Sequence, residues 1–334
     1  MSVLVTGGAG YIGSHTVVEL LERGEKIIIV DNFSNSKPEM LDKIKEITNK
    51  DFKFYEVDLL DRENLDKVFA ENPDIESVIH FAGLKAVGES VEKPIEYYHN
   101  NITGTLNILN SAVKHNCKNI VFSSSATIFG NPQKLPIDEN HPKNPENYYG
   151  FTKLSIEDYL EWYSNLKGIN YAALRYFNAA GYDVEGEISG LEQNPANLIP
   201  VVMETACGIR KEMSVFGDDY DTPDGTCIRD YVHVTDLSDA HVKALDYIAK
   251  NNTNLKLNLG SEVGTSVKEV IDIARKITEK PINAKVVDRR PGDPSELYAT
   301  SKQAFEILGW KAKYSDMETI IKTTWDAYLK NYQV

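Results

Sequence analysis

Cysteine is scarce in this chain of 334 residues, which contains only three. Cys117, Cys207 and Cys227 form no Cys-x-x-Cys pair, and no group of histidines accompanies them. A disulfide framework or a zinc site needs more cysteines or a closer spacing, so this scarcity argues against both. We therefore expect no metal, and we expect the protein to lie in the reducing cytoplasm.

Long apolar runs and an excess of positive charge are also lacking. No apolar run reaches the length of about 20 residues that a transmembrane helix requires. Lys and Arg number 36 against 50 Asp and Glu, which gives a formal net charge of −14. This charge is unfavourable for binding nucleic acid or an anionic membrane, and we expect neither as a partner. A strand pattern begins at residue 2, which predicts that there is no cleavable signal peptide.

What the chain does contain near its start is a glycine-rich turn between two apolar runs. Residues 2–6 indicate a buried strand; Gly7, Gly10 and Gly13 follow, and the second apolar run ends on Asp31. Glycines permit close approach of the backbone to a pyrophosphate, which the next helix attracts with its N-terminus. Asp31 is placed to accept hydrogen bonds from the adenosine ribose and would repel the extra phosphate of NADP. The pattern predicts an NAD site.

Strand and helix patterns continue to alternate beyond this turn. The further apolar strand patterns lie at 52–57, 77–83, 119–122 and 170–176. Repeated alternation is typical of a parallel sheet covered by helices on both faces. We therefore predict an α/β protein with a Rossmann-type doubly wound sheet and a smaller C-terminal α/β domain. Ligands of such a sheet bind at the carboxyl ends of its strands.

Tyr149 and Lys153 lie four positions apart in a predicted helix, so their side chains share one face. An ammonium group beside a phenol favours the phenolate and lowers the tyrosine pKa. That would make Tyr149 a usable base near neutral pH. Ser125, the last of three serines after a predicted strand, could share the proton. These three are our candidate catalytic residues.

The motifs resemble those of the extended short-chain dehydrogenase/reductases, and within that group the UDP-glucose 4-epimerase family. The resemblance covers nearly the whole chain. It is carried by residues 6–15, 31–32 with 35–36, 80–90, 123–127, 149–153, 174–178 and 229–234. It implies interconversion of UDP-galactose and UDP-glucose through a 4-keto intermediate, with tightly bound NAD, in a homodimer. It also implies that residues 1–177 form the NAD-binding domain, with segments around 230–260 returning to it. Residues 178–334 would form a UDP-sugar-binding domain, partly interleaved with the first.

The resemblance assigns NAD binding to residues near the strand ends. This set comprises Gly7, Gly10, Tyr11, Ile12, Gly13, Asp31, Asn32, Asn35, Ser36, Asp58, Leu59, Phe81, Ala82, Gly83, Lys85, Asn100, Ser123, Tyr149, Lys153, Tyr176 and Phe177.

The resemblance also assigns substrate-binding residues. Two arginines would clamp the diphosphate, since guanidinium groups match phosphate oxygens in bidentate geometry. The set comprises Lys85, Ser125, Thr127, Tyr149, Asn178, Asn197, Leu198, Val215, Phe216, Arg229, Tyr231, Arg290, Asp293 and Leu297. In the family, a large aromatic residue at the last of these positions restricts the enzyme to glucose and galactose, and a small residue admits N-acetylated sugars. Leucine is intermediate in size, so conversion of UDP-GlcNAc and UDP-GalNAc is an open expectation.

Three alternative functions are compatible with this fold. A nucleotide-sugar 4,6-dehydratase would carry an Asp-Glu pair directly after the serine at the strand end, where this chain has Ala126 and Thr127. A UDP-glucuronate 4-epimerase would need only one additional polar partner for the carboxylate. A non-catalytic NAD-sensing protein is disfavoured, because Ser125, Tyr149 and Lys153 are all present.

Overall fold

A seven-stranded sheet forms the centre of the computed structural model, which describes residues 2–191, 195, 197–290 and 293–332. Its strands are β1 (Ser2–Thr6), β2 (Lys26–Asp31), β3 (Lys53–Glu56), β4 (Ile75–His80), β5 (Asn119–Ser125), β6 (Asn170–Tyr176) and β10 (Leu255–Leu259). They pair in parallel in the order β10-β6-β5-β4-β1-β2-β3. Runs of Val and Ile suit strands that are buried on both faces. The predicted doubly wound α/β sheet is thereby confirmed.

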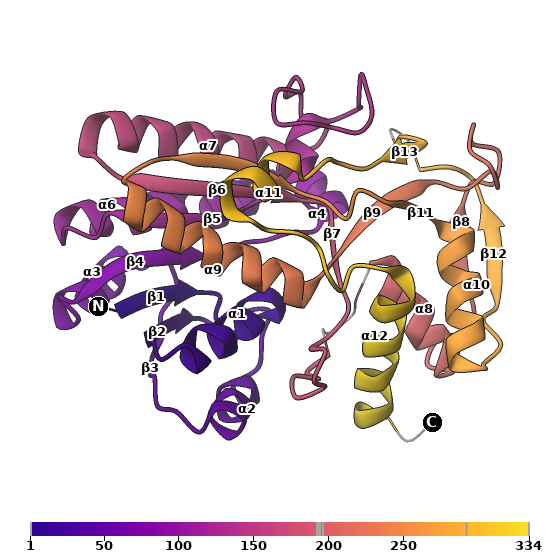
Figure 1. Ribbon diagram of the computed structural model, residues 1–334, viewed down its shortest axis with the longest axis horizontal. Helices are drawn as coiled ribbons and strands as arrows, with labels where there is room; N and C mark the ends of the chain where they lie inside the picture. The colour runs from indigo at the N-terminus through magenta and orange to yellow at the C-terminus, as the bar shows by residue number, and fades with distance from the viewer. Residues whose placement is uncertain (1, 192–194, 196, 291–292, 333–334) are drawn as a thin grey trace.

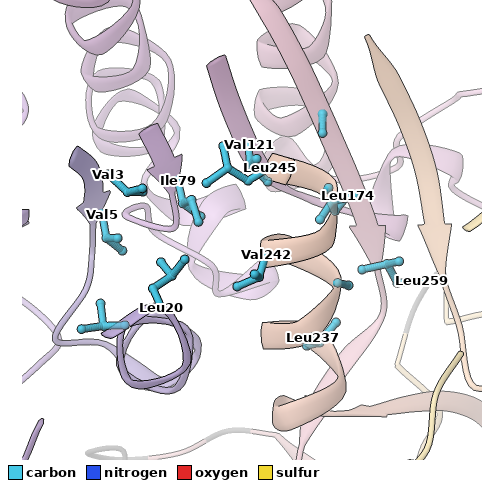
Figure 2. Close-up of a cluster of buried hydrophobic side chains, with 14 of the residues drawn as sticks. Val3, Val5, Leu20, Ile79, Val121, Leu174, Leu237, Val242, Leu245 and Leu259 are labelled. Carbon is cyan, nitrogen blue, oxygen red and sulfur yellow. The ribbon is translucent and has the colours of Figure 1, made fainter. Parts of the chain in front are cut away.

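Helices cover both faces of the sheet (Figure 1). One face holds α1 (Tyr11–Glu22), α2 (Glu39–Thr48), α9 (Val234–Asn251) and α11 (Lys302–Leu308). The other holds α3 (Arg62–Glu71), α6 (Gly104–Lys114) and α7 (Tyr148–Lys167). Figure 2 shows Leu20 of α1 and Val242 of α9 directed at Val5 and Ile79 of the strands. This apolar packing fixes the carboxyl ends of the strands relative to one another.

The helical stretch after β4 is less regular than the apolar spacing predicts. Short helices α4 (Val87–Glu92) and α5 (Pro94–Tyr97) lead into a π-helical segment, Tyr98–Thr103, before α6 begins. Such wide turns are frequent at functional sites. At the end of β5, a 3-10 turn, Ala126–Phe129, carries the chain away from the three serines.

Two smaller sheets lie beyond the large one (Figure 1). In one, β9 (Ile228–His233) pairs with β7 (Asn178–Ala180), β11 (Gly264–Ser266) and β13 (Glu296–Leu297). In the other, β8 (Met213–Phe216) pairs with β12 (Ala284–Val287). Their apolar core includes side chains of α8 (Leu198–Ala206), α10 (Val267–Thr278) and α12 (Met317–Asn331).

The chain returns to the large sheet after β9, because α9 and β10 complete it at the β6 edge. Among the helices that the structure describes, none combines the length and the apolar character needed to cross a membrane.

Candidate active site

The glycine turn lies where the strand order reverses, between β1 and β4. Gly7 has φ +70, and a Cβ added to it would lie 2.7 Å from the backbone nitrogen of Ala82. A Cβ on Gly13 would lie 2.1 Å from the carbonyl oxygen of Gly7. Helix α1 begins at Tyr11, directly after Gly10, and its first turn contains no Asp or Glu. The result is a narrow cradle at the positive end of a helix dipole, suited to a diphosphate.

Asp31 forms the polar rim beside this cradle. Its buried carboxylate accepts hydrogen bonds from Ala9 N at 3.1 Å, Phe33 N at 3.0 Å and Ser36 Oγ at 2.8 Å. Asn32 Nδ2 donates to Asp58 Oδ2 at 3.0 Å, which links the ends of β2 and β3. Asn35 is exposed beside this rim, and Leu59 is half-buried.

The three candidate catalytic residues come together at the same edge. Ser125 ends β5, and Tyr149 lies in the first turn of α7, where the Asn147 side chain accepts from Gly150 N at 2.8 Å. The Tyr149 hydroxyl lies close enough to the Ser125 side chain for this serine to act on its pKa. Lys153 follows one turn later, so Tyr149 and Lys153 share one face of α7.

Lys153 is fully enclosed by protein groups. Its Nζ donates to the carbonyl oxygen of Ser123 at 2.9 Å. It lies 4.7 Å from the ring centroid of Phe122 and 5.7 Å from that of Tyr149. Contact with two aromatic faces partly compensates the ammonium group for the loss of water.

Burial dominates the electrostatics of this group. It raises the pKa of Tyr149 to about 12, whereas the hydrogen bond with Ser125 acts in the opposite direction. Burial also lowers the pKa of Lys153 to about 8. The expectation that Lys153 lowers the pKa of Tyr149 below its ordinary value is therefore wrong for the polypeptide by itself. Loss of water around the phenol outweighs the attraction of an ammonium that is held at the Ser123 carbonyl.

Asn101, which sequence reasoning missed, ties the neighbouring loop to α7. Its Oδ1 accepts from Leu84 N at 2.8 Å, and its Nδ2 donates to Leu84 O at 3.0 Å and to Thr152 Oγ1 at 3.2 Å. Asn100, which was predicted to bind the cofactor, lies beside it in the π-helical segment and is half-buried. The sequence signal that could have identified Asn101 is the pair of adjacent asparagines, Asn100 and Asn101, within a predicted helix.

The remaining predicted cofactor residues surround the strand ends. Ser123 Oγ and the Tyr176 hydroxyl share a hydrogen bond. Ala82 N donates to the carbonyl oxygen of Thr6 at 3.2 Å. Ile12 and Phe81 pack against the main core, Phe177 packs beside the turn after β5, and Gly83 and Lys85 are exposed in the loop after β4.

The predicted substrate residues contact one another on the smaller sheets. Arg229 Nη2 pairs with the carboxylate of Asp293, and Arg229 Nη1 donates to the carbonyl oxygen of Ile228 at 2.8 Å. The Arg290 guanidinium lies 3.8 Å from the ring centroid of Phe216, a cation–π contact. Residues 291–292, which follow Arg290, lie outside the described part of the chain.

Leu297 connects this region with the turn that follows the carboxyl end of β5. In β13 it is the register partner of Arg229, and its half-buried side chain packs against the apolar cluster that contains Ala126 and Phe129. Asp230, buried behind the pair, accepts from Ala299 N at 3.1 Å and holds the two segments together.

The other predicted substrate residues differ in how accessible their side chains are to a ligand. Asn178 Nδ2 donates to the carbonyl oxygen of Asp230 at 2.8 Å. Val215 and Tyr231 are buried in the core of the smaller sheets, where little of either side chain is accessible. Half-buried side chains at this edge are Thr127 and Leu198, and Asn197 is exposed before α8.

A parallel sheet with a glycine turn at the strand reversal, combined with a Ser-Tyr-Lys group at its carboxyl edge, defines the class of the short-chain dehydrogenase/reductases. The family model described as GDP-mannose 4,6 dehydratase matches residues 4–324. The UDP-glucose 4-epimerase of Bacillus subtilis is 49% identical over 97% of this chain and 96% of its own.

Solved structures are similar over the same extent. The UDP-glucose 4-epimerase from Bifidobacterium longum in complex with NAD+ and UDP has a TM-score of 0.94 at 46% identity, covering 99% of each chain. The UDP-Glc/GlcNAc 4-epimerase from Campylobacter jejuni has a TM-score of 0.87 at 36% identity, covering 98% of this chain and 99% of that one. The chain belongs to the UDP-glucose 4-epimerase family.

Proposed function

We propose that the protein interconverts UDP-galactose and UDP-glucose by reversible oxidation of the sugar at C4, with tightly held NAD. The observation that carries this proposal is the convergence of Ser125, Tyr149 and Lys153 at the sheet edge that also holds the glycine turn. The similarity to enzymes named UDP-glucose 4-epimerase supports the same reaction.

The residues of the glycine turn fit NAD. Gly7 and Gly13 leave space where a Cβ would collide with backbone, so a diphosphate can approach the N-terminus of α1. Asp31 is positioned to accept hydrogen bonds from the adenosine ribose, and its negative charge disfavours NADP. Bound NAD supplies the hydride acceptor and donor, and in its oxidised form a positively charged nicotinamide ring.

Tyr149 Oη is the proposed base for the sugar 4-hydroxyl. Its proximity to Ser125 would let a proton pass between the sugar oxygen, Ser125 Oγ and Tyr149 Oη once the sugar is bound. Since burial raises the pKa of Tyr149 to about 12, the phenolate needs nearby positive charge. Lys153 Nζ is the cation that the chain itself contributes, and the Ser123 carbonyl fixes its position.

Epimerisation is favoured over dehydration by the residues after Ser125. Loss of water across C5 and C6 requires an acid and a base next to the sugar. Ala126 is buried and apolar, and Thr127 Oγ1 donates to Ser125 Oγ at 3.0 Å. Neither side chain ionises near neutral pH. We therefore place this chain with the epimerases, although the matching family model takes its description from a dehydratase.

We place the nucleotide sugar between the catalytic strand end and the smaller sheets. Arg229 and Arg290 supply the charge for a diphosphate, and Asp293 and Phe216 suit a ribose and a uracil ring. Because Arg229 already pairs with Asp293 and Arg290 covers Phe216, substrate binding exchanges these contacts for contacts with UDP. In this proposal residues 1–177 with the returning segments around 230–260 serve the cofactor, and 178–334 serve the substrate.

We extend the proposal to UDP-GlcNAc and UDP-GalNAc. Leu297 packs beside the turn that follows Ser125, so its size limits the space for a substituent on the sugar. Leucine leaves more room than an aromatic ring, and the similar Campylobacter jejuni protein is named a UDP-Glc/GlcNAc 4-epimerase.

We also propose a cytoplasmic homodimer. Helices α4, α5 and α7 expose large apolar side chains, among them Ile95 (72%), Leu166 (68%), Val91 (65%) and Trp162 (62%). Exposed apolar patches of this kind mark sites of protein association. The three free cysteines, of which Cys117 and Cys227 are buried, suit a reducing compartment.

Product analysis with UDP-galactose and no added cofactor tests the proposed function. We expect UDP-glucose as the product, and NAD in the extract of the denatured protein. A 4-keto-6-deoxy product would indicate a dehydratase instead. NAD in the extract without turnover of UDP-galactose, UDP-GlcNAc or UDP-glucuronate would indicate an NAD sensor.

A further inference from the structure

A buried ion pair lies directly behind the catalytic strand end. Glu157, one turn after Lys153 on α7, accepts from Arg175 of β6 through Nε–Oε1 at 2.9 Å and Nη2–Oε2 at 2.6 Å. The Arg175 side chain is 1% exposed and the Glu157 side chain 0%. Desolvation of two charges largely cancels their attraction, so stability is a weak explanation for such a pair.

The Glu157 carboxylate makes a third contact, with the residue that precedes Ser125. Ser124 Oγ donates to Glu157 Oε1 at 2.7 Å. Side chains alternate along a strand, so Ser124 points toward α7 on the same face as Phe122, while Ser123 points to the other face. α7 is therefore joined to the end of β5 by two hydrogen bonds one helical turn apart: Lys153 to the Ser123 carbonyl, and Ser124 to Glu157.

Arg175 adds a contact beyond the strand. Its guanidinium lies 5.5 Å from the ring centroid of Phe129, in the 3-10 turn that follows Ser125. The ion pair therefore contacts the chain on both sides of Ser125, at Ser124 before it and at Phe129 four residues after it.

We infer that Glu157, held in place by Arg175, is a positioning residue that acts through Ser124 to fix the Ser125–Tyr149 contact. The inference rests on the proposed epimerase function. Without this link, the carboxyl end of β5 would be held less firmly. Substrate binding at Arg229 and Arg290 would be unchanged, but the groups that transfer the proton would be misplaced. A small misplacement of reacting groups lowers the rate of the chemical step.

Ser124→Ala tests this directly, since it removes the link and leaves the Glu157–Arg175 pair intact. We expect kcat to fall about tenfold, which corresponds to about 1.4 kcal/mol of barrier, with KM for UDP-galactose within about twofold of wild type. Melting temperature and bound NAD should stay close to wild type. Ser124→Thr restores a hydroxyl and should recover most of kcat. Ser77→Ala, a buried serine at the start of β4 and far from the carboxyl edge, is the matched control.

Unchanged kcat in Ser124→Ala would overturn the inference. So would a loss of kcat that is matched by a lower melting temperature and a higher KM, because that combination indicates a general structural role. If Ser124→Ala does not fold, Ser124→Cys provides a weak donor of similar size, for which reduced kcat supports the inference and wild-type kcat refutes it. If wild type and Ser77→Ala do not turn over UDP-galactose, the proposed function itself has failed.

Discussion

Replacing Lys153 with methionine should make the protein more stable at neutral pH while impairing catalysis. Burial lowers the pKa of Lys153 to about 8, far below its ordinary value, so the folded state carries an unfavourable ammonium at pH 7. This displacement of the pKa corresponds to a cost of about 3 kcal/mol. Methionine has a similar shape and packs well against the Phe122 and Tyr149 rings. The Ser123 carbonyl loses its donor, which costs about 1–3 kcal/mol, so we expect a net gain of about 1 kcal/mol.

The stability gain of Lys153→Met over wild type should decrease as the pH rises. Between about pH 8 and about pH 10 the folded protein has released the Lys153 proton and the unfolded chain still binds it. The unfolded state then binds more protons, so wild-type stability increases with pH across this window. Lys153→Met lacks the group, so its advantage of about 1 kcal/mol at pH 7 should shrink and then reverse by pH 10, because wild type gains about 2 kcal/mol over this range.

Urea titrations of both proteins at pH 7 and pH 10 measure this difference, with bound nucleotide quantified in each sample. Lys311→Met, at an exposed position, is the matched control and should show no pH-dependent difference. A less stable Lys153→Met protein at pH 7, or an advantage that is the same at both pH values, would refute the reasoning. Activity should fall by at least about a hundredfold, in the range found for loss of an acid–base group.

Three further results are expected. Tyr149→Phe should lower kcat by about 10²–10⁴-fold while NAD content and melting temperature stay unchanged, and near wild-type turnover would exclude Tyr149 as the base. Leu297→Tyr should abolish conversion of UDP-GlcNAc while retaining that of UDP-galactose, measured by separation of products; equal loss of both would contradict a size-based role. Leu166→Asp should shift a dimer toward a monomer in light scattering, because it places a charge in the exposed apolar surface of α7, whereas the same change at exposed Lys311 should not.

The part of the fold nearest the N-terminus was predictable because its signals are local. The apolar run before Gly7, the helix after Gly10 and the second run to Asp31 each carry their own periodicity, and the structure has β1, α1 and β2 there. The place of Ser125 beside the glycine turn followed from topology, since parallel strands bring their carboxyl ends to one edge.

Other features depend on contacts between distant parts of the chain. Strands such as β13 and β7 have two and three residues, too few to show a period, and form only by pairing with β9. In the π-helical turn after α5, Tyr98 and Ile102 are four positions apart as in an ordinary helix, although Tyr97 is buried instead of Tyr98, so the sequence pattern does not reveal the turn. The pKa of Tyr149 follows from burial in the folded protein, which spacing along a helix does not report.

Leu297 and Arg229 are neighbours across a strand pair of two residues. If these two residues have the roles proposed for them, a change of side chain at Leu297 also changes the surroundings of the arginine that would hold the diphosphate. Mutations that widen the range of accepted sugars would be expected to weaken nucleotide binding at first. A second substitution near Asp230, which fastens the same segment through Ala299, would then be needed to restore it. A broader sugar range with full nucleotide affinity should therefore require paired changes, even where a single change is enough to narrow the range.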